Sequence, residues 1–316
     1  GIKSSVYIDA YRPGSFFFKH IKNPKSFNIL KVDTETWKKN KSDKINKFKM
    51  LEVDKFIKKR YFSDICVDIN FDSSDEISIE EFKLKYNLID EKRPVWAIFA
   101  HLNWDESGEF GNHLYPTLQE WTEKTIKHIM SCKNAIWLIK IHPQELKCPS
   151  KYSIKDLVSN LNLPENIKII DADVKLNPYY FQEIIDGGVT VAGTAGLEIA
   201  LKGKPVILAG NAHYGEKDFT INCKTKNEYL NKLSNAHKIK KLNQSQVENA
   251  YRYAHLFFFR KLISFPILVN KRDKNWKFQF NKILDLIPGN EKNLSFICES
   301  ILNGNDYVQD KPLLEE

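Results

Sequence analysis

Residues 187–210, GGVTVAGTAGLEIALKGKPVILAG, set the architecture that we expect for the whole chain. The stretch opens with a short apolar run, turns through the glycine-containing residues 193–196, continues with the spacing of a helix and closes on a second apolar run. Gly203 follows the helix as a C-cap, and Pro205 begins the next strand where no backbone donor is needed. Such a compact unit predicts two parallel strands joined by a crossover helix.

The same alternation of apolar runs and helical patterns precedes this unit. Three continuous apolar runs are typical of strands covered on both faces, and three further segments predict helices. The strands are expected at 95–100, 135–141 and 167–170, and the helices at 117–131, 153–161 and 178–186. We therefore predict an α/β protein with a doubly wound, Rossmann-like parallel sheet of five strands.

Ligands of such a sheet bind beyond the carboxyl ends of its strands. Four loops leave these ends in the predicted order, namely residues 101–113, 142–145, 193–196 and 210–219. We expect these loops to converge on one crevice. Two further helices, near 227–233 and 244–262, are expected to complete the domain.

The composition fits a globular protein of one large or two ordinary domains. Of the 316 residues, 42% are hydrophobic and 12% are aromatic, which is enough for a substantial core. The five cysteines are widely spaced and never form a CxxC pair, which argues against a disulfide framework and against a zinc site. No apolar run suits a bilayer span and no secretory signal is evident, so the expected setting is the cytoplasm.

The formal net charge of +8 raises the question of an anionic partner. The lysines are scattered among 40 acidic residues, and no arginine-rich stripe or nucleic-acid module is visible, so we expect no nucleic-acid partner. A compositional bias toward lysine explains the charge. The functional alternative is attraction to anionic lipid surfaces, as at the inner face of the cytoplasmic membrane, or to phosphorylated substrates.

The regularity of the pattern predicts three parts. Residues 1–90 form an irregular N-terminal region, residues 91–264 a Rossmann-like domain, and residues 265–316 a tail that is expected to pack back on the N-terminal region. Only the middle part carries the alternation of strands and helices.

The turn at 193–196 is the first candidate site. Backbone amides of Gly193, Thr194, Ala195 and Gly196 meet the start of a helix, where unpaired N–H groups and the helix dipole favour a phosphate. The hydroxyl of Thr194 adds a donor, and Glu198 lies one turn deeper, where a carboxylate suits the hydroxyls of a ribose. The alternatives are a close-packed turn without a ligand and an acid on the helix surface.

His142 and Pro143 form the second candidate. They follow an apolar strand that is interrupted only by Lys140, and the proline forbids helical continuation at the histidine. At a strand end inside the predicted crevice, His142 suits a contact with phosphate or ribose, with electrostatic help from Lys140. A core histidine bonded to a carbonyl, and a lysine extending to the sheet margin, are the alternatives.

Two further loops hold the remaining candidates. In the loop after the first strand, which also contains His101 and His113, Asp105 is the preferred catalytic base or nucleophile and Glu106 the second choice, with a solvated connection as the alternative. No HExxH, DxD or paired-cysteine spacing occurs, so we expect neither a metal nor another cofactor.

The loop at 210–219 contains His213, Tyr214 and Lys217. Tyr214 is placed to border a base and Lys217 to meet a diphosphate or a sugar carboxylate. The alternative is an ordered surface loop with Gly215 at a positive φ angle.

Four segments, taken together, resemble the C-terminal nucleotide-binding half of bacterial capsule and lipopolysaccharide synthesis proteins. These are GT-B glycosyltransferases related to the Kdo transferases of capsule assembly, and the resemblance covers about residues 93–233. The segments are IKIHPQE at 139–145, VTVAGTAGLE at 189–198, GKPVI at 203–207 and AHYG at 212–215.

The resemblance implies specific roles. In that family and in similar sialyltransferases, a His-Pro pair and a glycine turn with Ser or Thr hold the CMP part of an activated sugar. By resemblance these roles fall on His142, Pro143, Thr194 and the amides of 193–196, while Glu198 is similar to the ribose-binding acid of GT-B enzymes. A GT-B enzyme has two Rossmann-like halves, so a reduced N-terminal region or a piece of a longer protein is expected here.

The resulting expectation is a metal-independent glycosyltransferase, or a domain of one, for capsule or lipopolysaccharide synthesis. Its partners are a nucleotide-sugar donor, with CMP- or CDP-linked donors preferred, and a glycan or glycolipid acceptor. Catalysis is expected from Asp105 or Glu106 and from stabilisation of the departing phosphate by His142 and the turn amides. The alternatives are a polyol-phosphate transferase, an enzyme like UDP-N-acetylglucosamine 2-epimerase, and a non-catalytic nucleotide-binding scaffold.

Overall fold

The chain divides into two compact units. Unit 1 comprises residues 1–70 and 251–316, and unit 2 comprises residues 71–250. The computed structural model describes residues 4–12, 14–22, 28–62, 76–102, 114–265, 268–270, 276–278, 280, 282–287 and 289–310.

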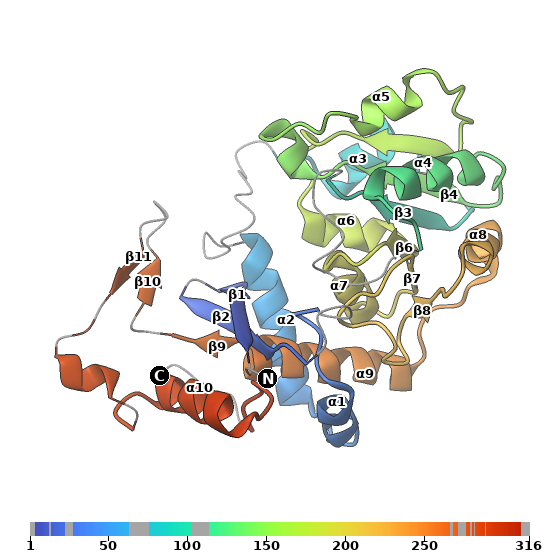
Figure 1. Ribbon diagram of the computed structural model, residues 1–316. Coiled ribbons are helices and arrows are strands. Elements are labelled where there is room, and N and C mark those ends of the chain that lie inside the picture. The colour runs from blue at the N-terminus through green and yellow to red at the C-terminus, as the bar shows by residue number, and fades with distance from the viewer. Residues whose placement is uncertain are drawn as a thin grey trace. The chain divides into compact units, whose positions relative to one another are not determined.

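Unit 2 is built on a six-stranded sheet with the order β5-β4-β3-β6-β7-β8, in which every neighbouring pair is parallel (Figure 1). The strands are β3 (Val95–Phe99), β4 (Ile136–Lys140), β5 (Ile167–Ile170), β6 (Gly187–Thr190), β7 (Val206–Leu208) and β8 (Ile221–Asn222). The predicted doubly wound parallel sheet is confirmed. The sixth strand, which the sequence pattern does not predict, has only two residues.

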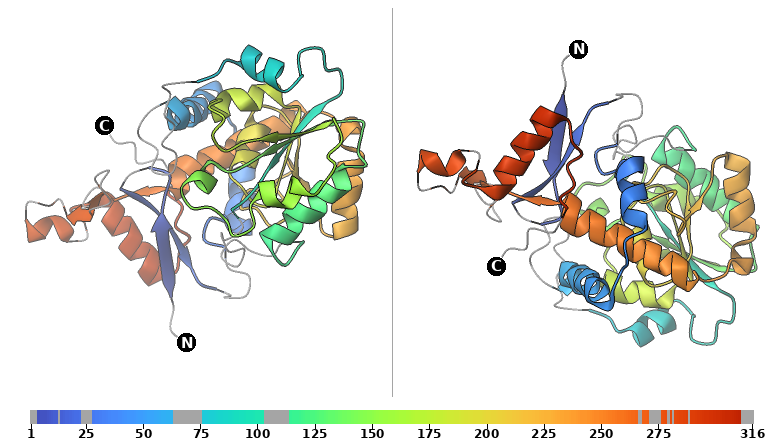
Figure 2. Two further views of the ribbon diagram at one scale, coloured as in Figure 1. Left: turned by 90° about the horizontal axis from the view of Figure 1, so that it is seen from above. Right: turned by 90° about the horizontal axis from the view of Figure 1, so that it is seen from below.

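Helices cover both faces of this sheet, as the two views in Figure 2 show. They are α3 (Ile79–Lys85), α4 (Leu118–Ile129), α5 (Ile154–Ser159), α6 (Pro178–Ile184), α7 (Ala195–Leu201) and α8 (Lys226–Ser234), with 3-10 turns at Pro143–Leu146 and Ala236–Lys238. One face packs on α4 and α8 in a continuous apolar core. On the other face, Phe99 of β3 contacts Phe181 of α6, and Gly188 of β6 lies against Ile199 of α7.

Close approach explains why β6 begins with glycine. A Cβ atom on Gly187 would lie 2.7 Å from the ring of Trp96 on the neighbouring strand β3, which no real side chain tolerates. Trp96 is buried, and its ring lies 6.3 Å from that of Trp137 on β4. The large indoles therefore fill the layer that the glycine leaves open.

Unit 1 joins the two ends of the chain. Its antiparallel sheet has the order β1-β2-β9, and β10 pairs with β11 in a separate hairpin. The elements are β1 (Ser5–Asp9), β2 (Ser15–His20), α1 (Thr34–Lys41), α2 (Lys47–Phe62), β9 (Ile263–Ser264), β10 (Leu268–Asn270), β11 (Trp276–Phe278), a 3-10 turn at Ile283–Leu286 and α10 (Lys292–Asn303). Its core is aromatic, with Phe17 of β2 stacked on Phe257 at a centroid distance of 4.8 Å.

The long helix that the sequence predicts at 244–262 is divided. It is an α-helix, α9 (Gln244–His255), which continues as a π-helix over Leu256–Lys261. The wider turn accommodates a run of buried aromatic side chains, Phe257 and Phe258, that pack on different neighbours. Among the described residues, no helix combines the length and the apolar character needed to cross a membrane.

A buried tyrosine ties α8 to α4. The hydroxyl of Tyr229 accepts a hydrogen bond from Trp121 Nε1 at 2.9 Å and lies 2.9 Å from Thr125 Oγ1. All three side chains are buried. The indole N–H therefore depends on one phenol for its acceptor.

Replacing Tyr229 by Phe is expected to destabilise unit 2 by about 1–3 kcal/mol, because the buried indole N–H loses its acceptor. Urea unfolding measures this as a lower midpoint with an unchanged slope. Tyr115→Phe is the matched control, since the hydroxyl of buried Tyr115 bonds to no described residue. Equal losses in the two variants would contradict the role given to the Tyr229 hydroxyl.

Candidate functional site

The strand order locates the candidate site. The chain winds outward from β3 through β4 to β5, returns to β6 beside β3, and winds outward again through β7 to β8. The point between β3 and β6 where the winding reverses is where sheets of this kind open a ligand crevice at their carboxyl edge. The loops after β3, β4, β6 and β7, which the sequence predicts to converge, all leave this edge.

A hydrogen-bonded network bridges the two central strand ends. Nε2 of His101, after β3, lies 3.0 Å from Oγ1 of Thr190, the last residue of β6, and accepts the N–H of Val191 at 3.3 Å. Thr190 Oγ1 accepts the N–H of Gly193 at 3.1 Å. Because Nε2 accepts from an amide, it carries no proton, and the Thr190 hydroxyl donates to it. The network thus assigns His101 as the neutral tautomer with its proton on Nδ1.

A hydrogen bond from Tyr214 holds the glycine turn. The Tyr214 hydroxyl donates to Gly193 O at 2.6 Å, and the Gly196 N–H donates to the same carbonyl at 3.1 Å. A Cβ atom on Gly196 would lie 2.1 Å from the Tyr214 hydroxyl, so only glycine fits there. The ring of Tyr214 is completely buried in this arrangement. Its predicted contact with a base remains a prediction, and the contact observed is with the turn.

The open side of the turn is half exposed at Gly193, Thr194 and Ala195. Thr194 precedes α7 as its N-cap residue, but its side chain makes no capping hydrogen bond. The amide of Gly193 already donates to Thr190 Oγ1. The contact of the turn amides with a phosphate remains a prediction.

Glu198 is not an acid on the helix surface. It is 2% exposed, and its Oε2 accepts a hydrogen bond from Nε2 of Gln182 on α6 at 2.9 Å. The alternative of a surface acid is therefore wrong. The predicted contact with a ribose remains a prediction, and in this structure the carboxylate lies between α6 and α7.

His142 lies two residues after the end of β4. It is the N-cap of the 3-10 turn Pro143–Leu146, and its Nδ1 accepts the N–H of Gln144 at 3.2 Å. That bond assigns the neutral ring's proton to Nε2. Desolvation by the surrounding protein and the nearby charge of Lys140 lower the pKa of His142, so a neutral donor is presented at the carboxyl edge.

Lys140 is the last residue of β4 and is half buried. Its Nζ lies 5.0 Å from the ring centre of Phe181, and no carboxylate among the described residues pairs with it. Burial lowers the pKa of Lys140 to about 8. A desolvated cation that has no counter-charge within the described residues suits an anionic ligand at the carboxyl edge.

Of the other predicted residues, some are buried and the rest fall outside the described part of the chain. His213 and Lys217 are both buried, and the His213 ring lies edge-on to Tyr214 at 5.0 Å. Asp105 and Glu106, together with His113, fall outside the described residues. Among the described residues no group of three His, Cys, Asp or Glu side chains is placed to hold a metal ion. Metal independence remains a prediction.

Sequence patterns miss two residues of the site. The pattern places Thr190 only in an apolar strand and Gln182 only in a helix. The available signal is positional, because Thr190 is the polar residue that ends a central buried strand directly before the glycine turn.

Replacing Lys140 by Met is expected to stabilise unit 2 at pH 7, because the folded protein no longer buries a charge. Below pH 8 the lysine is charged in both states, so this cost is complete. As the pH rises from about 8 toward the ordinary value of 10.5, the folded form loses its proton first and the wild type regains stability. Urea unfolding at several pH values should thus show a difference that shrinks across this range.

Lys168→Met on the edge strand β5 is the control for this experiment, since Lys168 is also half buried. An equal narrowing in Lys168→Met would show that the effect does not belong to Lys140. A destabilised Lys140→Met protein at pH 7 would contradict the unpaired charge.

Comparisons with known proteins agree with the resemblance found in the sequence. The family described as capsule polysaccharide biosynthesis protein matches residues 82–261, more than half of the 316 residues. No curated protein matches the chain.

Several solved structures are similar to the chain at low sequence identity. The KpsC β-Kdo 2,4 transferase of Thermosulfurimonas dismutans is 14% identical, with 79% of this chain and 71% of that chain covered and a TM-score of 0.47. The KpsC β-Kdo 2,7 transferase of the same organism is 15% identical, with 84% and 70% covered and a TM-score of 0.44.

A putative UDP-N-acetylglucosamine 2-epimerase from Listeria monocytogenes is 12% identical, with 70% and 48% covered and a TM-score of 0.35. These structural likenesses are distant, and the assignment rests on the family match. The chain belongs to the family of capsule polysaccharide biosynthesis proteins.

Proposed function

We propose that the chain is a glycosyltransferase, or a domain of one, that transfers a sugar from a nucleotide-activated donor during capsule or lipopolysaccharide synthesis. The observation that carries the proposal is the composition of the carboxyl edge around the β3–β6 reversal. There β4 ends in Lys140, which pairs with no described carboxylate, His142 follows as a neutral donor, and the glycine turn follows β6. Family membership supports the biological setting. We prefer a CMP- or CDP-linked donor, as the sequence resemblance implies.

The residues of the crevice suit the phosphate of such a donor. The Nε2–H of His142 donates without adding charge, and Lys140 supplies the positive charge that an anion requires. Both act best on the leaving phosphate, because negative charge grows there as the bond to the sugar breaks. The half-exposed amides at Thr194 and Ala195 suit the same group, and Pro143 keeps the backbone of His142 extended.

Transfer also needs a group that accepts the proton of the acceptor hydroxyl. We propose Asp105 first and Glu106 second for this role, because their loop follows β3 at the same edge. The acceptor hydroxyl then attacks the anomeric carbon, its proton passes to the carboxylate, and the nucleotide leaves with the bonding electrons. The proposed setting is the cytoplasm at the membrane face, with a glycan or glycolipid as acceptor and no metal or other cofactor.

Nucleotide binding tests the donor site directly. CMP, CDP, UDP and GDP are compared by the shift in thermal unfolding, and the preferred nucleotide should stabilise the protein by about 2.7 kcal/mol at one hundred times its dissociation constant. His142→Ala should weaken that binding about tenfold, because a hydrogen bond to a charged group is lost.

His237→Ala is the matched control, since His237 lies in the 3-10 turn beyond the far end of α8. It should leave nucleotide affinity unchanged. No stabilisation by any of the four nucleotides would overturn the donor site, and so would equal effects of the two histidine variants.

A further inference from the structure

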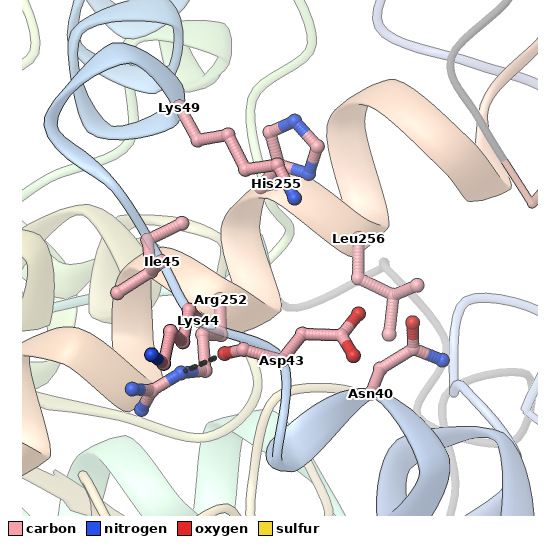
Figure 3. Close-up of a pocket in the computed structure, with 8 residues that line it drawn as sticks. All are labelled: Asn40, Asp43, Lys44, Ile45, Lys49, Arg252, His255 and Leu256. Atoms are coloured by element: carbon pink, nitrogen blue, oxygen red, sulfur yellow. Dashed lines mark hydrogen bonds between the residues drawn. The ribbon is translucent and has the colours of Figure 1, made fainter.

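A small hollow opens in unit 1 between the end of α1, the turn after it, the start of α2 and the end of α9 (Figure 3). Its volume is about 240 Å³ with the adjoining solvent included. Its polar wall consists of Asn40, Asp43, Lys44, Lys49, Arg252 and His255. We call this hollow the basic pocket. All of its residues belong to unit 1, so it shares none with the crevice of unit 2.

Cations outnumber acids in the wall of the basic pocket. Lys44, Lys49 and Arg252 line the pocket, and Asp43 supplies the single carboxylate of the lining. The Asp43 carboxylate pairs with Arg260, which is not a lining residue: Nη1 of Arg260 lies 3.8 Å from Asp43 Oδ2. Arg252 Nε donates to the backbone oxygen of Asp43 at 2.7 Å, which holds the guanidinium at the wall. The pocket is therefore net positive.

The start of α2 adds to this positive potential. The first turn of α2 contains Lys47 and Lys49 and no acidic residue. Lysines at the positive end of a helix dipole are unfavourable, and helices ordinarily place Asp or Glu there. An anion held in the basic pocket would remove this local cost.

His255 adds an imidazole without a described hydrogen bond to the pocket wall. The residue is only 5% exposed, and its ring stacks on that of Phe259 at a centroid distance of 5.2 Å. Within the described part of the chain neither ring nitrogen forms a hydrogen bond, and the Glu52 carboxylate, 3.7 Å from Nε2, is beyond hydrogen-bonding distance. The pocket wall therefore contains an imidazole to which no described residue forms a hydrogen bond, and a ligand in the pocket can use it.

The charge state of His255 follows from the groups around it. Burial, together with the positive charges of Lys49 on α2 and Arg260 on the π-helix, lowers the pKa of His255 to about 4. Figure 3 shows Lys49 beside the His255 ring. The imidazole is therefore neutral at physiological pH. It offers one N–H to a ligand and adds no positive charge to that of the neighbouring lysines and arginines.

We propose that the basic pocket binds a phosphate group. A phosphate dianion presents three acceptor oxygens in a tetrahedral arrangement, which several lysine and arginine donors can engage together. A carboxylate has two oxygens in one plane and serves fewer donors. Lys44 and Asp43 are exposed at the rim, so the remainder of a larger ligand stays outside. The phosphate belongs either to a small soluble phosphate ester or to a lipid headgroup.

Binding of inorganic phosphate to the full chain tests the site, with sodium chloride adjusted to constant ionic strength. Isothermal titration should show saturable binding. The double variant Lys44→Gln and Lys49→Gln should weaken it at least about tenfold, because charge-assisted hydrogen bonds are lost. The matched control is Lys55→Gln with Lys58→Gln, which removes the same charge from exposed positions further along α2. The control should change binding less than about twofold.

His255→Leu provides a second variant that leaves the net charge unchanged. It should weaken phosphate binding without altering the dependence of binding on ionic strength. Absence of saturable phosphate binding would overturn the proposal, and so would equal weakening by the pocket variant and the control variant, which would indicate a general charge effect. Neither outcome bears on nucleotide binding in unit 2, which is measured separately.

Two probes distinguish the sources of the phosphate. Glycerol phosphate represents a soluble ester, and vesicles of phosphatidylcholine with phosphatidic acid represent a lipid headgroup. Binding of glycerol phosphate that is lost in the pocket variant supports a soluble ligand. Vesicle binding that is lost in the pocket variant but kept in the control supports a lipid. Loss of neither kind of binding in the pocket variant would overturn the site.

Discussion

The pairing of β3 with β6 is the constraint on which the arrangement of unit 2 depends. Because these two strands are parallel neighbours although two strands separate them in sequence, the winding must reverse between them. The loops after β3 and β6 then continue to opposite sides of this point, which is where sheets of this kind bind their ligands. The His101–Thr190 contact crosses the same boundary, so a side-chain contact joins the two halves of the sheet at the point of reversal.

Much of this architecture is predictable from the sequence. Strands β3 and β4 are buried on both faces along most of their length, so the sequence of each is an almost continuous apolar run that predicts a covered strand. The two-residue strand β8 escapes prediction because so short a segment has no periodicity. The division of residues 244–262 escapes it because α- and π-helices have similar local patterns, and packing selects between them.

The side-chain chemistry of the crevice is less predictable. Helical spacing locates Glu198 beside the glycine turn, but not the burial that comes from Gln182 on another helix. The sequence suggests a ligand contact for Tyr214, whereas its hydroxyl is committed to Gly193, twenty-one residues away in sequence. Such contacts depend on which helices meet across the sheet. Which helices meet is determined by the packing of the whole chain, so the local pattern around a few polar residues does not predict these contacts.

The discontinuity of unit 1 has a consequence for the order in which the chain folds. Its core requires Phe17 from the early part of the chain and Phe257 from the late part, whereas unit 2 lies wholly between them. During synthesis, residues 71–250 therefore leave the ribosome while unit 1 still lacks its second half. Domains fold as units when their residues become available. Unit 2 can thus complete its sheet first. The apolar residues of β2 stay unpaired with their partners in the nascent chain until residues 251–316 have been made.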